Sequence, residues 1–332
     1  MRQKIRVSEV EKALQSQRSL WPGVSERAID LGDEAQTSGD RPHRIILVGE
    51  GSSLSAAQLA YWMLRKQGLR REWKASKLFV FSAADALLSE SFDSSDFLIG
   101  VTHRGRTQTV SDVLKKGRAR GARCARVLSQ DVTLKVRASE LRVPTGPLEK
   151  VEPHTQALST ALCALTSFLG ESKYWKKFWR QAALNPDPSL SELRYDLKKR
   201  YGRSSGPQIL VGRADGEALA RELQLKFLEM ARFPSWVFSS ESFFHGPQWA
   251  LAAKGRPEML IPSTFFREAR RDEYRLRRTA EFPSVSEGIG GSPCAQVLEN
   301  LVRCHWMALA LALNLGLNPD APNLVSSTRR SS

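Results

Sequence analysis

The chain has 332 residues, a length that suits two domains of about 130 to 150 residues better than a single core. Hydrophobic residues make up 41% of the sequence and charged residues 26%, and the apolar stretches are too short to span a bilayer. This composition excludes a fibrous, a disordered and a transmembrane protein. Lysine and arginine number 50 against 35 acidic residues, so the formal charge of +15 favours anionic partners.

The start of the chain and the cysteines bear on cellular location and metal content. Residues 1–21 form a charged amphipathic pattern without the apolar core of a signal peptide, so we expect a cytoplasmic protein. The cysteines show neither a CxxC pair nor metal-ligand spacing; they are Cys124, Cys163, Cys294 and Cys304. Because each lies in an apolar segment, we expect buried free thiols and neither a metal nor another cofactor.

Strand-like runs alternate with helical patterns along the first half of the chain. Runs typical of strands occupy residues 44–49, 78–83, 96–102, 122–129 and 141–144, and residues 154–170 form a long apolar helix. Alternation of this kind predicts an α/β fold in which a parallel sheet is connected by crossover helices.

The same order begins again after residue 207. A strand at 208–212, a helix at 217–230, strands at 235–240 and 257–263, a charged helix near 265–280 and an apolar helix at 295–316 follow one another. RIILVGEGSS and QILVGRADGE hold equivalent places, which indicates an internal repeat. We therefore expect an N-terminal helical segment at 1–42, a first domain at 43–184, a linker at 185–206 and a second domain at 207–332.

Two junctions between a strand and a helix in the first half are rich in hydroxyl groups. EGSSLS at 50–55 follows the first strand, and THRGRT at 102–107 follows the third. Ligands of parallel sheets lie at the carboxyl ends of strands, where helix N-termini offer unpaired N–H groups to anions. A serine at a helix start is often only an N-cap, but two such junctions in one basic chain favour an anion site.

The order of several motifs resembles that of a known family. GEGSS, THRGRT, GPLEKVEPHTQALSTAL, LQLKFLE, ESFFHGP and NPDAPNL occur in the order found in the sugar isomerase (SIS) domain family. The double-domain branch of that family includes the isomerase half of glucosamine-6-phosphate synthase and related sugar-phosphate deaminases and deglycases. The resemblance implies two domains of this type, each a parallel sheet flanked by helices, related by a pseudo-twofold axis.

The resemblance also implies roles for individual residues. By position, Ser53 and Thr107 match phosphate ligands, Ser52, Thr102 and His103 line the same loops, and Glu149 matches the glutamate of a GPE motif. Lys226 and Glu229 match a K-x-x-E pair whose glutamate moves a proton between C1 and C2 of the opened sugar. His245 matches a ring-opening histidine that reaches the neighbouring subunit's active site, so a homodimer is expected.

The chemistry requires these residue types independently of the resemblance. Interconversion of an aldose and a ketose, or loss of ammonia from an amino sugar, needs a carboxylate that takes a proton from one carbon and returns it to the next. An apolar setting raises the pKa of such a carboxyl group toward the useful range. Ring opening needs a second proton carrier, a role that imidazole suits at neutral pH, and the reaction requires no metal.

Two positions depart from the family pattern. Arg104 stands where the family has a serine, and a guanidinium there can grip an anion but needs more room. Arg106 is expected to point to solvent. In the C-terminal tail Ser326 replaces a lysine that contacts the open-chain sugar, so an amine able to form a Schiff base is missing.

Plainer interpretations stand beside these. Lys226 and Glu229 could be a surface ion pair, His245 could be a structural turn residue, and His305 is expected to be a buried core histidine. We expect the Trp-rich stretch at 174–179 to be a domain-bridging helix. Nucleic acid is not the expected ligand, because no recognition motif accompanies the basic residues.

The sequence therefore predicts an enzyme that isomerises, deaminates or deglycates a phosphorylated hexose or amino sugar through an enediol or enolamine. The alternative is a non-catalytic sensor or regulator that binds a sugar phosphate.

Overall fold

The computed structural model describes residues 8–37, 41–133, 140–201, 208–245, 247, 258–261, 263–265 and 291–320. Its helices are α1 (Glu9–Thr37), α2 (Ser52–Gln67), α3 (Ala83–Ser89), α4 (Gln108–Ala119), α5 (Gln156–Leu169), α6 (Ser172–Ala182), α7 (Leu190–Tyr201), α8 (Asp215–Ala231), α9 (Ser240–Phe244) and α12 (Pro293–Asn314), with a 3₁₀ turn η1 at Arg71–Trp73. Its strands are β1 (Arg44–Gly49), β2 (Lys77–Ser82), β3 (Asp96–Val101), β4 (Arg123–Leu128), β5 (Glu140–Pro144), β6 (Gln208–Gly212), β7 (Ser235–Ser239) and β8 (Glu258–Ile261).

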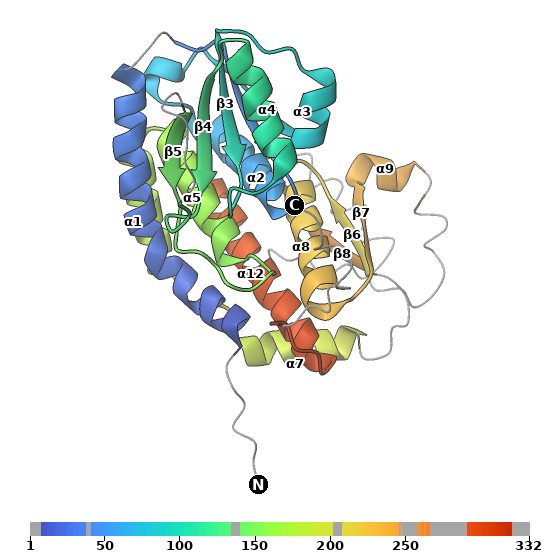
Figure 1. Cartoon of the computed structure of the whole chain (residues 1–332). Coiled ribbons are helices and arrows are strands. Elements are labelled where there is room, and N and C mark those ends of the chain that lie inside the picture. The colour runs from blue at the N-terminus through green and yellow to red at the C-terminus, as the bar shows by residue number, and fades with distance from the viewer. Residues whose placement is uncertain are drawn as a thin grey trace.

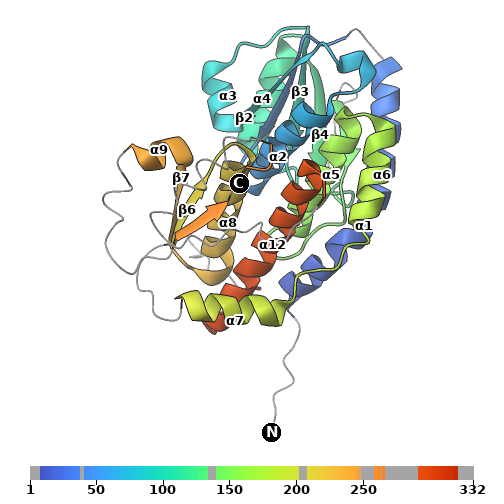
Figure 2. The ribbon, with the colours of Figure 1, turned by 180° about the vertical axis from the view of Figure 1, so that it is seen from behind.

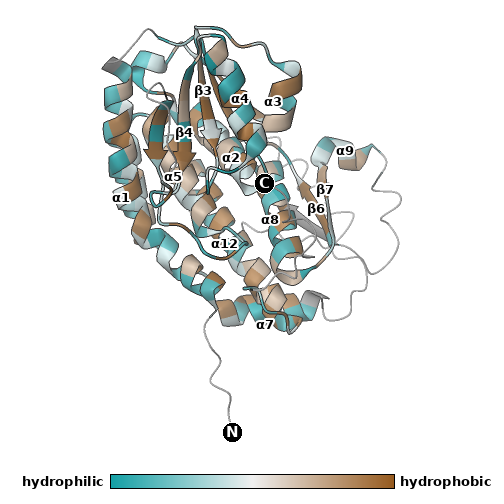
Figure 3. Ribbon diagram, in the orientation of Figure 1, coloured by the Kyte–Doolittle hydropathy of each residue, from teal (hydrophilic) through white to brown (hydrophobic). Residues whose placement is uncertain are grey.

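The first half is a five-stranded sheet with the strand order β2-β1-β3-β4-β5, and all its strands are parallel (Figure 1). Side chains alternate along each strand. Ile45 and Leu47 of β1 join the core beneath α2 and α5, whereas Ile46 and Val48 join a second cluster beneath α3 and α4. Both faces of the sheet are thus covered by helices, which explains why β1 and β3 are apolar after their first residue. Figure 3 shows the apolar colour of β3.

The described part of the second half has a related arrangement. The described strands form a parallel sheet in the order β7-β6-β8, with α8 following β6. The charged helix expected near 265–280 and most of the stretch between α9 and β8 lie outside the described residues. The α/β fold class is confirmed, while the pair of complete sheets is shown only in part.

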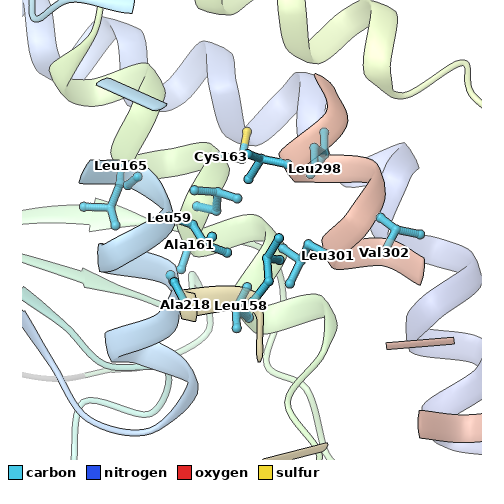
Figure 4. Close-up of a cluster of buried hydrophobic side chains, with 14 of the residues drawn as sticks. Leu59, Leu158, Ala161, Cys163, Leu165, Ala218, Leu298, Leu301 and Val302 are labelled. Carbon is cyan, nitrogen blue, oxygen red and sulfur yellow. The ribbon is translucent and has the colours of Figure 1, made fainter. Parts of the chain in front are cut away.

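One core joins the two halves. Leu59 of α2, Leu158 of α5, Ala218 of α8 and Leu301 of α12 belong to a single buried cluster (Figure 4). Seen from behind, α12 runs between α8 on one side and α1 and α5 on the other (Figure 2). The halves are therefore packed as one body, so that a site can draw residues from both.

The segment that connects the two halves contains the helices α6 and α7. The Trp-rich helix α6 packs mainly against α1 and α5 of the first half, and its Tyr174 also hydrogen-bonds Ser292 and Cys294 at the start of α12. The segment expected as a linker contains α7, which buries Leu193 and Leu197 and packs against α12. The boundaries proposed for the two domains remain predictions.

The internal repeat is visible in the backbone of two turns. Gly51, before α2, has φ 53° and ψ −132°, and Ala214, before α8, has φ 54° and ψ −116°. Positive φ at alanine is uncommon, and here it reproduces the turn that glycine adopts in the first half. Asp215, which follows Ala214, is fully buried and accepts hydrogen bonds from the Ser263 hydroxyl and from the amide and hydroxyl of Thr264, the latter two at 2.9 Å.

The turn after β1 depends on a close approach at Gly49. A Cβ atom there would lie 2.7 Å from the backbone carbon of Ser53, so Gly49→Ala should lower the free energy of unfolding by about 1 to 3 kcal/mol. Gly23→Ala in α1 is the control, because its Cβ would meet only the Arg27 side chain at 3.5 Å. Urea titration of both variants measures the effect, and equal stabilities would contradict the role given to Gly49.

Candidate functional site

A cavity of about 430 Å³ lies at the carboxyl ends of β1 and β3. The chain leaves β1 toward β2 on one side and β3 continues on the other, so the strand order reverses between these two strands. Ligands of open parallel sheets bind at this topological switch point. Its lining includes seven residues expected from the sequence, namely Ser52, Ser53, Thr102, His103, Arg104, Thr107 and Glu229.

Hydroxyl groups and a helix N-terminus form one wall of the cavity. The hydroxyl oxygens of Thr102 and Thr107 lie 3.1 Å apart, and Thr107 is the N-cap of α4 without a side-chain capping bond. Gly105 has φ 69°, which lets the loop turn sharply into the helix. Unpaired N–H groups and hydroxyl donors at a helix start are suited to an anion.

Two arginines border this wall. Arg104 Nη1 lies 3.2 Å from Glu152 Oε1, with about a third of each side chain exposed. Arg106 is exposed, as expected, but it also borders the cavity, so the expectation that it only faces solvent is corrected. Glu152 thus holds Arg104 at the cavity, and an anionic ligand has to compete with this carboxylate for the guanidinium group.

The lining also includes Glu229, which is paired with the fully buried Lys226. Lys226 Nζ donates to Glu229 Oε2 at 2.7 Å and to Ser52 Oγ at 2.9 Å, and it lies 3.5 Å from Glu222 Oε1. Because Lys226 has no exposed surface, the pair is not the surface ion pair considered from the sequence. Burial raises the pKa of Glu229 above its usual range, although the charge of Lys226 opposes this.

Ser52 lines the cavity, but its hydroxyl is hydrogen-bonded to the buried Lys226 and Glu222. Its hydroxyl accepts from Lys226 and donates to Glu222 Oε1 at 3.3 Å. In this arrangement its only proton is directed to Glu222, so it has none to donate to a ligand oxygen. Ser53 and the α4 wall remain as donors toward an anion.

His103 and Glu149 support the cavity from one side. The Glu149 amide donates to His103 Nε2 at 3.0 Å, so that nitrogen carries no proton, and burial lowers the pKa of His103 to about 4. The Glu149 carboxylate is almost fully buried and accepts from the Thr155 amide at 3.1 Å and the Ala157 amide at 2.9 Å. Glu149 therefore fixes the loop before α5 and does not line the cavity, and burial raises its pKa.

His245 and Ser326 are the remaining residues expected at the site. His245 ends α9, is exposed and is not among the residues that line the cavity. Ser326 lies outside the described residues. Within this chain, His245 is not brought to the cavity that Glu229 lines.

No family model and no curated protein matches the amino-acid sequence. Solved structures match in three dimensions. The C-terminal domain of glucosamine-fructose-6-phosphate aminotransferase from Francisella tularensis has a TM-score of 0.72 at 15% identity, over 95% of this chain and 98% of that chain. Tagatose-6-phosphate ketose/aldose isomerase from Escherichia coli has a TM-score of 0.73 at 15% identity, over 94% and 95% of the two chains. Glucosamine-6-phosphate deaminase from Thermotoga maritima has a TM-score of 0.70 at 17% identity, over 95% and 98%.

The protein has the sugar isomerase fold. This confirms, at the level of the fold, the resemblance inferred from the order of the motifs. The likeness extends over nearly the whole length of each of these chains. At these sequence identities the likeness concerns the fold alone, and the reaction has to be argued from the site.

Sequence reasoning missed three residues near the centre of the sugar isomerase fold. Glu152 and His154 line the cavity, and burial lowers the pKa of His154 to about 3. Glu222 lies behind Lys226. Glu222, Lys226 and Glu229 are spaced i, i+4 and i+7, which places them on one helix face, and this spacing was a readable signal.

The expectations for the cysteines and for His305 hold. All four cysteines are free and buried. His305 is fully buried and its Nε2 lies 3.3 Å from Glu222 Oε1, as expected of a hydrogen-bonded core histidine. Within the described ranges, no group of three or more His, Cys, Asp or Glu side chains is placed to hold a metal ion, and no helix there is both long and apolar enough to cross a bilayer.

Proposed function

We propose that this protein acts on a phosphorylated hexose or amino sugar, as an aldose–ketose isomerase or as a deaminase or deglycase. One observation carries the proposal. Glu229, a carboxyl group with a raised pKa, shares a cavity with the hydroxyl-rich N-terminus of α4 at the switch point of the sheet. A base and an anion site in one cavity are what proton transfer on a sugar phosphate requires.

The reaction follows from this placement. The phosphate binds to the amides and hydroxyls at the α4 N-terminus, with Ser53 and Arg104 as further donors. Glu229 removes a proton from the carbon next to the carbonyl and returns it to the neighbouring carbon of the enediol. Lys226 holds the carboxylate by a 2.7 Å hydrogen bond and keeps its second oxygen available to the substrate.

Ring opening requires a proton carrier beside the ring oxygen. We assign this role to His245 of a second copy, because the exposed His245 of this chain is not among the residues that line the cavity. The proposal therefore includes a homodimer. It also includes a cytoplasmic location, where sugar phosphates are made and consumed.

The test begins with a thermal-shift screen. Fructose 6-phosphate, glucosamine 6-phosphate, an N-acetylated amino-sugar phosphate and a 6-phosphofructosyl-amine are compared with their unphosphorylated forms. Stabilisation that requires the phosphate supports the proposal, and the tightest ligand enters a turnover assay. Stabilisation without turnover of that ligand would favour a sugar-phosphate sensor, and no stabilisation by any of them would refute a sugar-phosphate function.

Arg104 should contribute to ligand affinity. Arg104→Ala removes a guanidinium at the anion wall, and we expect the dissociation constant for the tightest sugar phosphate to rise about tenfold. The exposed Arg120 at the end of α4 provides the matched control, Arg120→Ala. Isothermal titration calorimetry measures both, and equal affinities of the two variants would remove Arg104 from the site.

A further inference from the structure

Behind the Lys226–Glu229 ion pair lie two further ionisable residues, of which Glu222 contacts Lys226 and His305 contacts Glu222. Glu222 of α8 and His305 of α12 have no exposed surface, and neither lines the cavity. Glu222 Oε1 lies 3.5 Å from Lys226 Nζ and 3.3 Å from His305 Nε2. His305, Glu222, Lys226 and Glu229 thus form a continuous row from α12 to the cavity wall, which we call the α8–α12 row.

The row contains two carboxyl groups but only one ammonium group. One ammonium, that of Lys226, lies between the carboxylates of Glu222 and Glu229. The charge of Lys226 and the hydrogen bond from His305 outweigh burial at Glu222 and lower its pKa, whereas burial dominates at Glu229 and raises its pKa. Lys226 contacts both carboxylates, at 3.5 Å from Glu222 and 2.7 Å from Glu229, and Glu229 is the one that takes up a proton more readily.

His305 determines how firmly Glu222 holds its charge. Burial lowers the pKa of His305, so the imidazole is neutral and can donate one hydrogen bond from Nε2 to Glu222. A buried carboxylate that loses such a donor binds a proton more readily, because its charged form is left with less compensation. The protonation state of Glu222 therefore determines how much of the Lys226 charge is left uncompensated beside Glu229.

We propose that His305 and Glu222 are positioning residues. Glu222, kept ionised by the hydrogen bond from His305, neutralises part of the Lys226 charge from the side away from the cavity, and Glu229 therefore stays basic. This inference rests on the proposed role of Glu229 as the base. Neither residue touches the substrate, since both lie outside the cavity wall. They act on the reaction only through Lys226.

Other groups face this row and are unchanged by the test. Glu152, from the loop before α5, raises the pKa of Glu229, and Glu149 raises the pKa of Lys226. Ser52 of α2 hydrogen-bonds both Lys226 and Glu222. Variants at Glu222 and His305 leave these contributions in place.

The test measures the titration of Glu229 directly. ¹³C NMR of the ¹³C-glutamate-labelled full chain follows the carboxyl carbon of Glu229, assigned by its disappearance in Glu229→Gln. In Glu222→Gln the midpoint of the Glu229 titration should fall by about one pH unit, because Lys226 then has Glu229 as its only ionised partner in the row. In His305→Leu the midpoint should fall in the same direction, because Glu222 then binds a proton.

Two controls separate this role from a structural one. His305→Gln keeps an N–H donor and should leave the midpoint of Glu229 unchanged, and Met307→Leu changes a buried side chain of α12 without touching the row. A lower melting temperature with an unchanged midpoint in Glu222→Gln and His305→Leu would overturn the proposal. If Glu222→Gln does not fold, His305→Leu against His305→Gln decides alone.

The outcome is distinguishable from that of the proposed function. The NMR titration needs no substrate, so it can support the coupling of His305 and Glu222 to Glu229 even if no sugar phosphate is turned over. Where turnover is found, the acidic limb of kcat/KM should move with the midpoint in each variant. An acidic limb that stays in place while the midpoint moves would show that Glu229 is not the base, and would refute the proposed function but not the coupling.

Discussion

Glu229→Gln should lower turnover of the sugar phosphate about a thousandfold or more while the ligand still binds. Glutamine keeps the shape of the side chain and can still contact Lys226, but it cannot take a proton from carbon. The loss should therefore appear in kcat, with the dissociation constant almost unchanged. Steady-state kinetics together with calorimetry of the same ligand separate these two quantities.

The control is another carboxylate of the same helix. Glu217 pairs with Arg221 at 2.7 Å on α8 and does not line the cavity, so Glu217→Gln should keep full activity. If Glu229→Gln retained more than a tenth of the activity, proton transfer would have to be assigned to another group. Glu152, on the same cavity, would then be the next carboxylate to test.

Lys226→Met should produce the largest loss of stability. Methionine fills much of the volume but leaves Glu222 buried without its cation, and breaking a buried ion pair in this way costs about 3 to 5 kcal/mol. We expect the melting temperature to fall by about 10 °C. The exposed Lys198 of α7 provides the control, Lys198→Met, which should leave the melting temperature unchanged.

The loss at Lys226 should depend on pH in a defined direction. In the wild type Lys226 lowers the pKa of Glu222, so that pair contributes stability at neutral pH that disappears as the carboxylate is protonated. In Lys226→Met the buried carboxylates have raised pKa values, and their cost disappears as the pH falls. The stability gap between the two proteins should therefore narrow from about pH 8 to about pH 5, and a gap independent of pH would contradict this account.

The parts of the fold that follow from local pattern were predictable from the sequence. Apolar runs such as residues 44–49 and 96–102 became β1 and β3, because a strand covered by helices on both faces has to be apolar throughout. The hydroxyl-rich junctions at Ser53 and Thr107 came together because the carboxyl ends of parallel strands meet at one edge.

The parts that depend on long-range packing were not predictable in this way. Glu152 and His154 enter the cavity from an irregular loop whose course is set by the buried Glu149, and no periodicity reports such a course. His305 reaches Glu222 only because α12 packs on α8, a contact between residues 83 positions apart. That the two halves share one core could not be predicted either, because an apolar helix has the same sequence pattern whether it packs within one domain or between two.

The turn before α8 has a consequence for binding stoichiometry. At the place where the first half has the Ser52 hydroxyl, the second half has the Asp215 carboxylate, already saturated by donors from Ser263 and Thr264. The duplicated turn thus contains an anion supplied by the chain itself, and a phosphate would find its donors occupied. We therefore expect no second phosphate to bind at this turn, so that one equivalent of sugar phosphate should saturate each chain.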